Sequence, residues 1–214
     1  WREDPTLDHY GSFLYLKNVR TGFVWSAGIQ PCATVPDDYL VAFHEDRAEI
    51  NRRDGPVTTT LDIMVSAEDD AEVRHLTLLN AGHETLEFDV TSYAELALLA
   101  QDADLAHPAF TKLFVQTEFL PEAKALVATR RRRTPDEPEI WVAHLAVSPL
   151  AVTVETDRAA FIGRGHTVRS PAAIAGNSAL SGRTGTVLDP SFSLRIRATL
   201  KPGTTTRISF WTMA

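Results

Sequence analysis

Residues Val73–Leu96 read VRHLTLLNAGHETLEFDVTSYAEL and contain the clearest structural pattern in the chain. Leu86, Phe88 and Val90 recur at every second position with polar residues between them, which is the period of an extended strand with one apolar face. A break around Gly82 separates this run from a similar apolar run before it. We therefore predict two long strands joined as an antiparallel hairpin, with one buried face and one solvated face.

The rest of the chain repeats this alternation between short turns such as Asp54-Gly55. Further strands are predicted over residues 12–19, 23–25, 39–44, 48–52, 57–65, 112–119, 125–132, 139–147, 151–156, 192–200 and 205–212. Strands that follow one another without long helices exclude a parallel sheet built from βαβ units. We predict an all-β fold in which two antiparallel sheets form a sandwich, as a single domain over residues 1–214.

Three segments depart from the strand pattern. The Leu- and Ala-rich residues 95–106 predict a turn of helix. Residues 104–110 predict an ordered loop, because Pro108 restricts its own backbone and that of its neighbour. Residues 170–185 are small and contain glycine, which is typical of a long surface loop. At most a few helical turns are therefore expected beside the sheets.

The composition limits the partners of the domain. A formal net charge of −7 argues against nucleic acid and against an anionic membrane surface, both of which attract basic patches. Cys32 is the only cysteine, so no internal disulfide forms, and we expect a reducing, cytoplasmic location. No run approaches the roughly 20 apolar residues that a membrane-spanning helix needs.

The two ends of the chain suggest a larger polypeptide. The chain begins with Trp1-Arg2-Glu3-Asp4, without an initiator methionine or a charged-then-apolar leader. It ends within the strand-like pattern of residues 210–214. We therefore expect the sequence to be a piece of a longer protein.

Histidines are the first candidates for a metal site or an acid–base pair. The chain contains seven, namely His9, His44, His75, His83, His107, His144 and His166. None forms an HExxH motif or a paired HxH arrangement with a nearby set of Cys or carboxylate ligands, so we expect no metal, no cofactor and no catalytic residue. His107 stands apart because it precedes Pro108 and Phe110 in a segment predicted to be stiff.

An arginine run and two glycine-rich stretches resemble binding motifs for phosphate or nucleic acid, but each has a structural interpretation that needs no ligand. The run Arg130–Arg133 is followed by Asp136 and Glu137, which indicates a solvated edge strand or hairpin tip. Gly163-Arg164-Gly165 and residues 181–185 precede no predicted helix, whereas a phosphate cradle requires donors at a helix N-terminus. We interpret both glycine-rich motifs as turns.

Aromatic rings that stack on the apolar faces of sugars are the candidates for carbohydrate contact. The chain offers Trp1, Tyr10, Tyr15, Trp25, Phe110, Trp141 and Trp211, most of which are expected to fill the core or an interface. Tyr15 and Trp25 lie on facing strands of the first predicted hairpin, which predicts that they share a surface. We keep Tyr15, Trp25, His107 and Phe110 as candidate carbohydrate-contact residues.

Several stretches together carry a family resemblance. Residues Tyr10–Asn18 (YGSFLYLKN) followed by Thr21–Ser26 (TGFVWS) resemble an N-terminal signature of glycoside hydrolase family 94. Residues 91–95, 104–119 and 157–165 are similar to that family too. The family holds cellobiose phosphorylase-like enzymes and the phosphorylase-like region of cyclic β-1,2-glucan synthases, and the chain looks closest to the synthase and β-1,2-oligoglucan phosphorylase branch. Leu16-Lys17-Asn18 stands where the family pattern has Leu-Arg-Asp, so contacts of that Arg-Asp pair are not carried over.

The resemblance implies a super-sandwich of two large antiparallel sheets, like galactose mutarotase, that precedes a helical linker and an (α/α)6 barrel. The general acid and the phosphate pocket belong to the barrel, so no catalytic residue is carried onto this chain. The implied role is non-catalytic: the domain packs on its own C-terminal barrel, walls part of the glycan cleft, binds β-linked gluco-oligosaccharide weakly and supports a homodimer. The parent enzyme is then an inverting phosphorylase or a glycosyltransferase-type enzyme, attached to a membrane if it is a glucan synthase.

Two other functions stay open on the sequence. In the first alternative, the domain is a purely structural platform between domains or subunits and makes no contact with sugar. In the second it is a self-sufficient mutarotase-like epimerase, for which His75, His107 and His144 are the candidate bases. No spacing pairs any of the three with a particular carboxylate.

Overall fold

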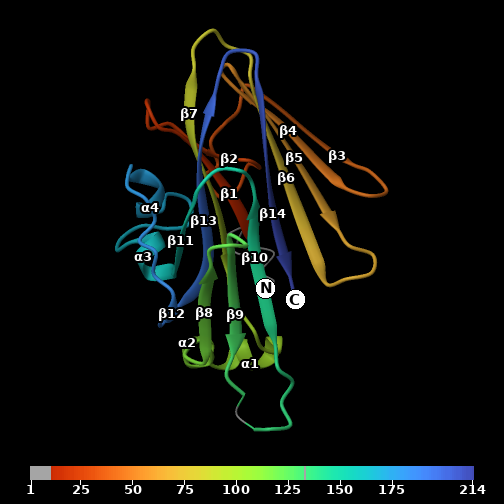
Figure 1. The fold of residues 1–214 in the computed structure, drawn as a ribbon, viewed down its shortest axis with the longest axis vertical. Coiled ribbons are helices and arrows are strands. Elements are labelled where there is room, and N and C mark those ends of the chain that lie inside the picture. Colours follow the sequence, from red (N-terminus) through yellow and green to blue (C-terminus); the bar gives the residue numbers. More distant parts are fainter. Residues whose placement is uncertain (1–10, 133) are drawn as a thin grey trace.

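The computed structural model describes residues 11–132 and 134–214, and Figure 1 shows two facing antiparallel sheets with short helices at their margins. The chain start Trp1–Asp4, together with His9, Tyr10 and Arg133, lies outside the described residues. No helix in the described ranges is long and apolar enough to cross a membrane.

The smaller sheet has five strands in the order β11-β13-β7-β1-β2. Its strands are β1 (Ser12–Asn18), β2 (Val24–Ser26), β7 (Leu86–Glu95), β11 (Val152–Asp157) and β13 (Pro190–Leu200). The larger sheet has nine strands in the order β12-β8-β9-β10-β14-β6-β5-β4-β3. These are β3 (Asp38–Phe43), β4 (Ala48–Asp54), β5 (Val57–Val65), β6 (Ala71–Asn80), β8 (Val115–Leu120), β9 (Ala125–Arg130), β10 (Trp141–Val147), β12 (Gly185–Thr186) and β14 (Thr205–Met213). The predicted all-β, two-sheet antiparallel sandwich is confirmed.

The predicted central hairpin is wrong, because β6 and β7 lie in different sheets. β6 pairs with β5 and β14, whereas β7 pairs with β1 and β13. The last two predicted strands, over residues 192–200 and 205–212, would form a final hairpin by the same reasoning, but β13 lies in one sheet and β14 in the other. Alternation of apolar and polar residues identifies a strand and its apolar face but does not identify the strand that it pairs with. Here the β6–β7 and β13–β14 connections both cross from one sheet to the other.

Asn80 holds these two crossings together at one end of the sandwich. Its side chain is buried, and its Nδ2 donates to the carbonyl oxygen of Leu200 at 3.1 Å. Its backbone carbonyl accepts from the N–H of Gly203 at 2.8 Å, and its Oδ1 accepts from the N–H of Gly82 at 2.9 Å. A Cβ at Gly82 would lie 2.8 Å from Cβ of Pro56, so this crossing requires glycine.

The core consists of two apolar clusters on opposite faces of the five-stranded sheet. The larger cluster fills the space between the sheets and includes Leu16, Trp25, Leu76, Phe88, Leu126, Phe192, Leu194, Ile208 and Phe210. The second lies between that sheet and its covering loops, and includes Tyr15, Tyr93, Phe161, Ile162, Val168 and Ile174. Since β7 is buried on both faces, the predicted solvated face of that strand is also wrong.

Four short helices complete the described fold. They are α1 (Gln101–Ala106), α2 (Pro108–Lys112), α3 (Arg158–Ile162) and α4 (Ala172–Ala175). The expected turn of helix before residue 106 is present, but the predicted loop over residues 104–110 is wrong. Pro108 occupies the first turn of α2, where the missing N–H breaks no helical hydrogen bond. Figure 1 shows α1 and α2 at one end of the sandwich and α3 and α4 beside the five-stranded sheet.

Strand β3 forms one edge of the nine-stranded sheet. Figure 1 shows β3 and β4 extending away from the five-stranded sheet. The side chains of Leu40 and Phe43 on β3 are 61% and 85% exposed. An edge strand with exposed apolar side chains is a ready surface for pairing with another chain.

Candidate functional site

Tyr15 and Trp25 do not share a surface, which corrects the expectation from the sequence. In the β1–β2 register Tyr15 lies opposite Ser26, while Leu16 lies opposite Trp25, so the two aromatic side chains point to opposite faces of the sheet. Both are buried, with 0% and 2% of their surface exposed. Neither ring has a free face on the described surface for a sugar to stack on.

Each of these two rings has a packing role. The Tyr15 hydroxyl donates to the carbonyl oxygen of Val168 at 2.6 Å, and burial raises the pKa of this phenol. Trp25 contacts Phe88 edge-on, with ring centroids 5.5 Å apart, and lies at the same centroid distance from Phe23. Tyr15 therefore fastens the covering loops to the sheet, and Trp25 closes one side of the inner core.

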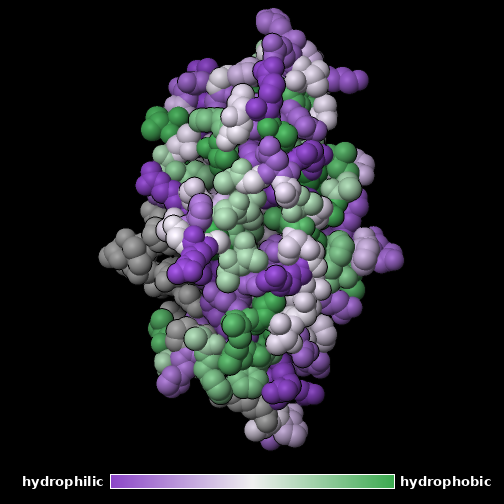
Figure 2. All heavy atoms as spheres, turned by 90° about the vertical axis from the view of Figure 1, so that its left-hand side faces the viewer, coloured by the Kyte–Doolittle hydropathy of each residue, from purple (hydrophilic) through white to green (hydrophobic). Residues whose placement is uncertain are grey.

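His107 and Phe110 lie together on the surface, at the junction of α1 and α2. His107 is exposed, and Phe110 is 53% exposed. The Phe110 ring contacts Phe114 edge-on at 5.2 Å between centroids. Figure 2 shows hydrophobic residues gathering at the height of α1 and α2 on the face that it presents. These two candidates are therefore available for contact with a partner or ligand.

The arginine run borders this same end of the molecule. β9 lies between β8 and β10, so the edge-strand interpretation is wrong, and Arg130 at its end is buried. The hairpin interpretation holds for Arg131, which is exposed in the connection between the paired strands β9 and β10. The guanidinium of Arg131 lies 5.5 Å from the ring centroid of Phe114, and that of Arg130 lies 5.7 Å from it. Arg130 also pairs with Glu137 at 3.5 Å. The run supports an aromatic ring and binds a carboxylate of its own loop.

His144 is a structural histidine of the inner core. Its ring stacks between Phe192 and Phe210, with centroids 6.0 Å away on either side. Its Nε2 lies 2.8 Å from Oγ of Ser92, and its Nδ1 lies 2.9 Å from Oγ1 of Thr212. Burial lowers its pKa to about 4, so the ring is neutral at neutral pH.

The geometry gives no support to an epimerase site. His75 bonds the Ser209 hydroxyl on β14, His144 lies in the inner core, and His107 lies at the end of α1. The three candidate bases therefore have separate environments. Among the described residues, no group of three His, Cys, Asp or Glu side chains is placed to hold a metal ion.

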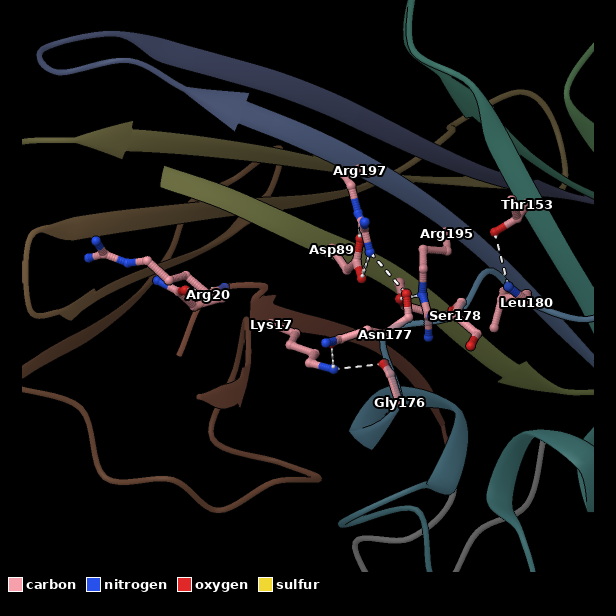
Figure 3. A network of polar contacts seen from close by, with 12 residues as sticks. Lys17, Arg20, Asp89, Thr153, Gly176, Asn177, Ser178, Leu180, Arg195 and Arg197 are labelled. Atoms are coloured by element: carbon pink, nitrogen blue, oxygen red, sulfur yellow. Dashed lines mark hydrogen bonds and ion pairs between the residues drawn. The ribbon is translucent and has the colours of Figure 1, made fainter. Parts of the chain in front are cut away.

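A cluster of cations covers the outer face of the five-stranded sheet (Figure 3). Arg197 binds both oxygens of Asp89, at 2.7 and 2.8 Å. Arg195 donates to the carbonyl oxygens of Ser178 and Ala173 at 2.9 and 2.8 Å. The bonds of Arg195 attach α4 and the segment after it to β13, and the Arg197–Asp89 pair joins β13 to β7.

Lys17, which stands at one departure from the family pattern, belongs to the same cluster. Its Nζ donates to the carbonyl oxygens of Ala175 and Gly176, at 2.8 and 2.6 Å, and to Oδ1 of Asn177 at 2.7 Å. The side chain is buried, and three acceptors match the three hydrogens of its ammonium group. In this chain Lys17 therefore attaches the end of α4 and the segment after it to β1.

Arg52 and Asp54 form a buried ion pair on β4. Arg52 is 1% exposed, and its Nε and Nη2 reach the two oxygens of Asp54 at 2.6 and 2.8 Å. The same guanidinium donates to the carbonyl oxygens of Gly28 and Thr34, at 3.1 and 2.9 Å. This pair fixes the loop between β2 and β3 to the nine-stranded sheet.

An open pocket of about 370 Å³ lies beside this ion pair. It is lined by Asn18, Thr21, Phe23, Trp25, Val35, Asp37, Asp54, Gly55, Pro56, Val57, Leu86 and Phe88. Phe23, 47% exposed, is its accessible aromatic side chain. The sequence interpretation selected Trp25 and passed over Phe23, although Thr21-Gly22 before it marked a turn that exposes the following ring.

Comparison with known proteins decides the family. The model of the family described as "Glycosyl hydrolase 94, supersandwich domain" matches residues 1–214. The chain belongs to this family. Figure 1 accordingly displays the super-sandwich of a glycosyl hydrolase 94 protein, and the resemblance predicted from the sequence is confirmed.

Two curated relatives are much longer than this super-sandwich domain. The chain is 38% identical over 218 residues to the cyclic beta-(1,2)-glucan synthase NdvB of Rhizobium meliloti (strain 1021). This match covers 100% of the chain and 8% of the synthase. It is 25% identical over 192 residues to solabiose phosphorylase of Paenibacillus borealis, covering 89% of the chain and 24% of that enzyme. The super-sandwich domain thus spans a small part of each relative.

The fold also occurs in a solved polysaccharide lyase. That structure matches with a TM-score of 0.51 and 15% identity, over 96% of this chain and 26% of the lyase. At this level of identity the likeness concerns the fold alone.

Proposed function

We propose that this super-sandwich is a non-catalytic domain of a larger β-glucan phosphorylase or glucan-synthase-type enzyme. It packs on a catalytic (α/α)6 barrel elsewhere in the parent chain and walls part of the glycan cleft. The observation that carries the proposal is the family match over the whole domain, together with the small share of each relative that the domain spans. The reaction of the parent is phosphorolysis of, or transfer to, a β-linked glucosyl unit.

The end of the sandwich formed by α1 and α2 is the surface best suited to this role. Leu105, Phe110 and Leu113 are 64%, 53% and 42% exposed, and exposed apolar groups of this kind are typical of interaction surfaces. Phe110 offers a ring for stacking on a pyranose, and His107 beside it offers polar groups for hydroxyls. We assign contact with both the barrel and the glycan cleft to this end.

A titration of the ¹⁵N-labelled chain with a β-1,2-linked gluco-oligosaccharide tests the glycan contact. We expect weak, saturable amide shifts around His107 and Phe110, since this surface is only one wall of the cleft. Phe110→Ala removes the stacking ring and is expected to weaken binding at this end about tenfold. The matched control is Phe43→Ala, which removes an exposed ring from edge strand β3, away from this end.

The alternative is a purely structural platform for neighbouring domains or a second subunit. The exposed apolar side chains of edge strand β3 favour it, because they suit strand-to-strand pairing. The same titration separates the two functions. Amide spectra that stay unchanged at every position, with a molecular mass that rises with protein concentration in sedimentation, favour the platform.

A further inference from the structure

The open pocket beside Arg52 lies far along the chain from α1 and α2 and has a composition of its own. The β1–β2 turn, the loop before β3, the β4–β5 turn and the start of β7 each contribute part of its wall. Its volume of about 370 Å³ falls within the range of small-ligand sites. Four segments distant in sequence thus converge on one monosaccharide-sized space.

Aromatic side chains form one wall of this pocket. Phe23 and Trp25 meet at a 37° interplanar angle, and Phe88 supports Trp25 from the core side. The indole Nε1 of Trp25 is buried and has no hydrogen-bond partner in the described part of the chain. Because Trp25 lines the pocket beside Phe23, the signal of this N–H reports on changes at the aromatic wall.

The polar groups of the pocket offer both donors and acceptors. Asn18 uses its Oδ1 to accept the N–H groups of Arg20 and Thr21, which orients the other end of the amide as a donor. Asp37 accepts from the N–H of Gly55 at 2.7 Å and keeps further acceptor capacity. Vicinal hydroxyls of a sugar donate and accept at once, and they match such a mixed set.

The charged side chains in and beside the wall of the pocket indicate which class of ligand it can bind. Arg52 neutralises Asp54, and Arg53 lies 3.6 Å from Asp37, so the two carboxylates are balanced by two guanidinium groups. An anion would meet carboxylates, and an apolar side chain of a partner protein would bury them without hydrogen bonds, which is unfavourable. A neutral ligand rich in hydroxyl groups avoids both penalties.

We propose that this pocket is a second glycan-contact site, which takes one glucosyl unit of a β-linked glucan against Phe23. The identity of the sugar rests on the proposed function, whereas the preference for a neutral polyol rests on the pocket itself. The site lies outside the α1–α2 end. It holds the glucan by a second point of contact, which raises its effective concentration near the parent enzyme's cleft.

The indole N–H signal of Trp25 in a ¹H–¹⁵N spectrum, assigned by its loss in Trp25→Phe, reports on this pocket directly. Titration with a β-1,2-linked glucotriose is expected to shift it saturably. Phe23→Ala is expected to weaken this response about tenfold, since it removes the accessible ring. Asn18→Asp keeps the oxygen that accepts from the turn and removes the amide donor, and about a fivefold loss is expected. Phe110→Ala, at the other end, should leave the Trp25 response unchanged.

The outcomes distinguish this inference from the proposed function. Shifts at His107 and Phe110 with a static Trp25 signal would overturn the pocket site and leave the proposed function standing. A Trp25 shift that survives in folded Phe23→Ala and Asn18→Asp proteins would also overturn it. A pocket response without any response at α1 and α2 would support the second site and contradict the assignment of the first.

Discussion

Replacing Arg52 with alanine is expected to destabilise the domain by about 3–5 kcal/mol, the usual effect of breaking a buried ion pair on one side. The variant leaves the buried carboxylate of Asp54 without its bidentate partner. It also removes the donor to the carbonyl groups of Gly28 and Thr34, so the loop between β2 and β3 loses its attachment. Urea unfolding followed by circular dichroism measures the change in free energy of unfolding.

Arg53→Ala is the matched control for this variant. Arg53 is the next residue on β4 and pairs with Asp37 at 3.6 Å, but both side chains are about half exposed. Surface pairs of this kind contribute less than about 1 kcal/mol. A loss in Arg52→Ala no larger than that in Arg53→Ala would show that the buried pair does not hold the loop. The double variant Arg52→Met with Asp54→Leu is expected to recover part of the loss, because no lone charge stays buried.

The second large expected effect is a loss of stability of the folded domain at acidic pH, caused by His144. His144 has a folded-state pKa of about 4, below its ordinary value of 6.5, because the inner core excludes water from the charged ring. Between these two values the unfolded chain binds a proton that the folded chain does not, so stability falls as the pH drops from about 6.5 towards 4. The depression corresponds to about 3 kcal/mol lost over that window. Above pH 6.5 the contribution of this histidine is complete.

Comparison with His144→Gln isolates this contribution, because glutamine keeps hydrogen bonding to Ser92 and Thr212 but does not titrate. The wild-type free energy of unfolding, measured at intervals from pH 7 to pH 4, should fall more steeply than that of the variant. His83→Gln, on the exposed β6–β7 connection, should follow the wild-type curve. Parallel curves for wild type and His144→Gln would contradict a neutral, buried His144.

The strands could be predicted from local pattern, but their pairing could not. The alternation of Leu86, Phe88 and Val90 located β7 correctly. Its intervening polar residues suggested a solvated face, whereas Asp89 binds Arg197 and Tyr93 stacks on Phe161 at 4.8 Å between centroids. Both partners come from distant parts of the chain. The nearest turn therefore suggested a hairpin where the chain crosses between the sheets.

Of the four candidate residues, two lie on the surface and two are buried, and their contact with sugar stays a prediction. His107 and Phe110 were selected as neighbours in a stiff segment, and the structure places both on the surface of the α1–α2 junction. Tyr15 and Trp25 were selected as aromatics on facing strands, but strand parity sends them to opposite buried faces. Phe23 was missed because its importance depends on a pocket that four separate segments form.

The proposed non-catalytic role of this domain requires that the reactive centre lie in another part of the parent protein. Phosphate-dependent cleavage of β-1,2-linked gluco-oligosaccharide, followed by release of glucose 1-phosphate, measures this directly for residues 1–214 and for the parent polypeptide side by side. We expect no turnover by the folded domain at any concentration of sugar or phosphate, and turnover by a parent that is a phosphorylase. Sustained release of glucose 1-phosphate by the 214-residue domain alone would contradict the account.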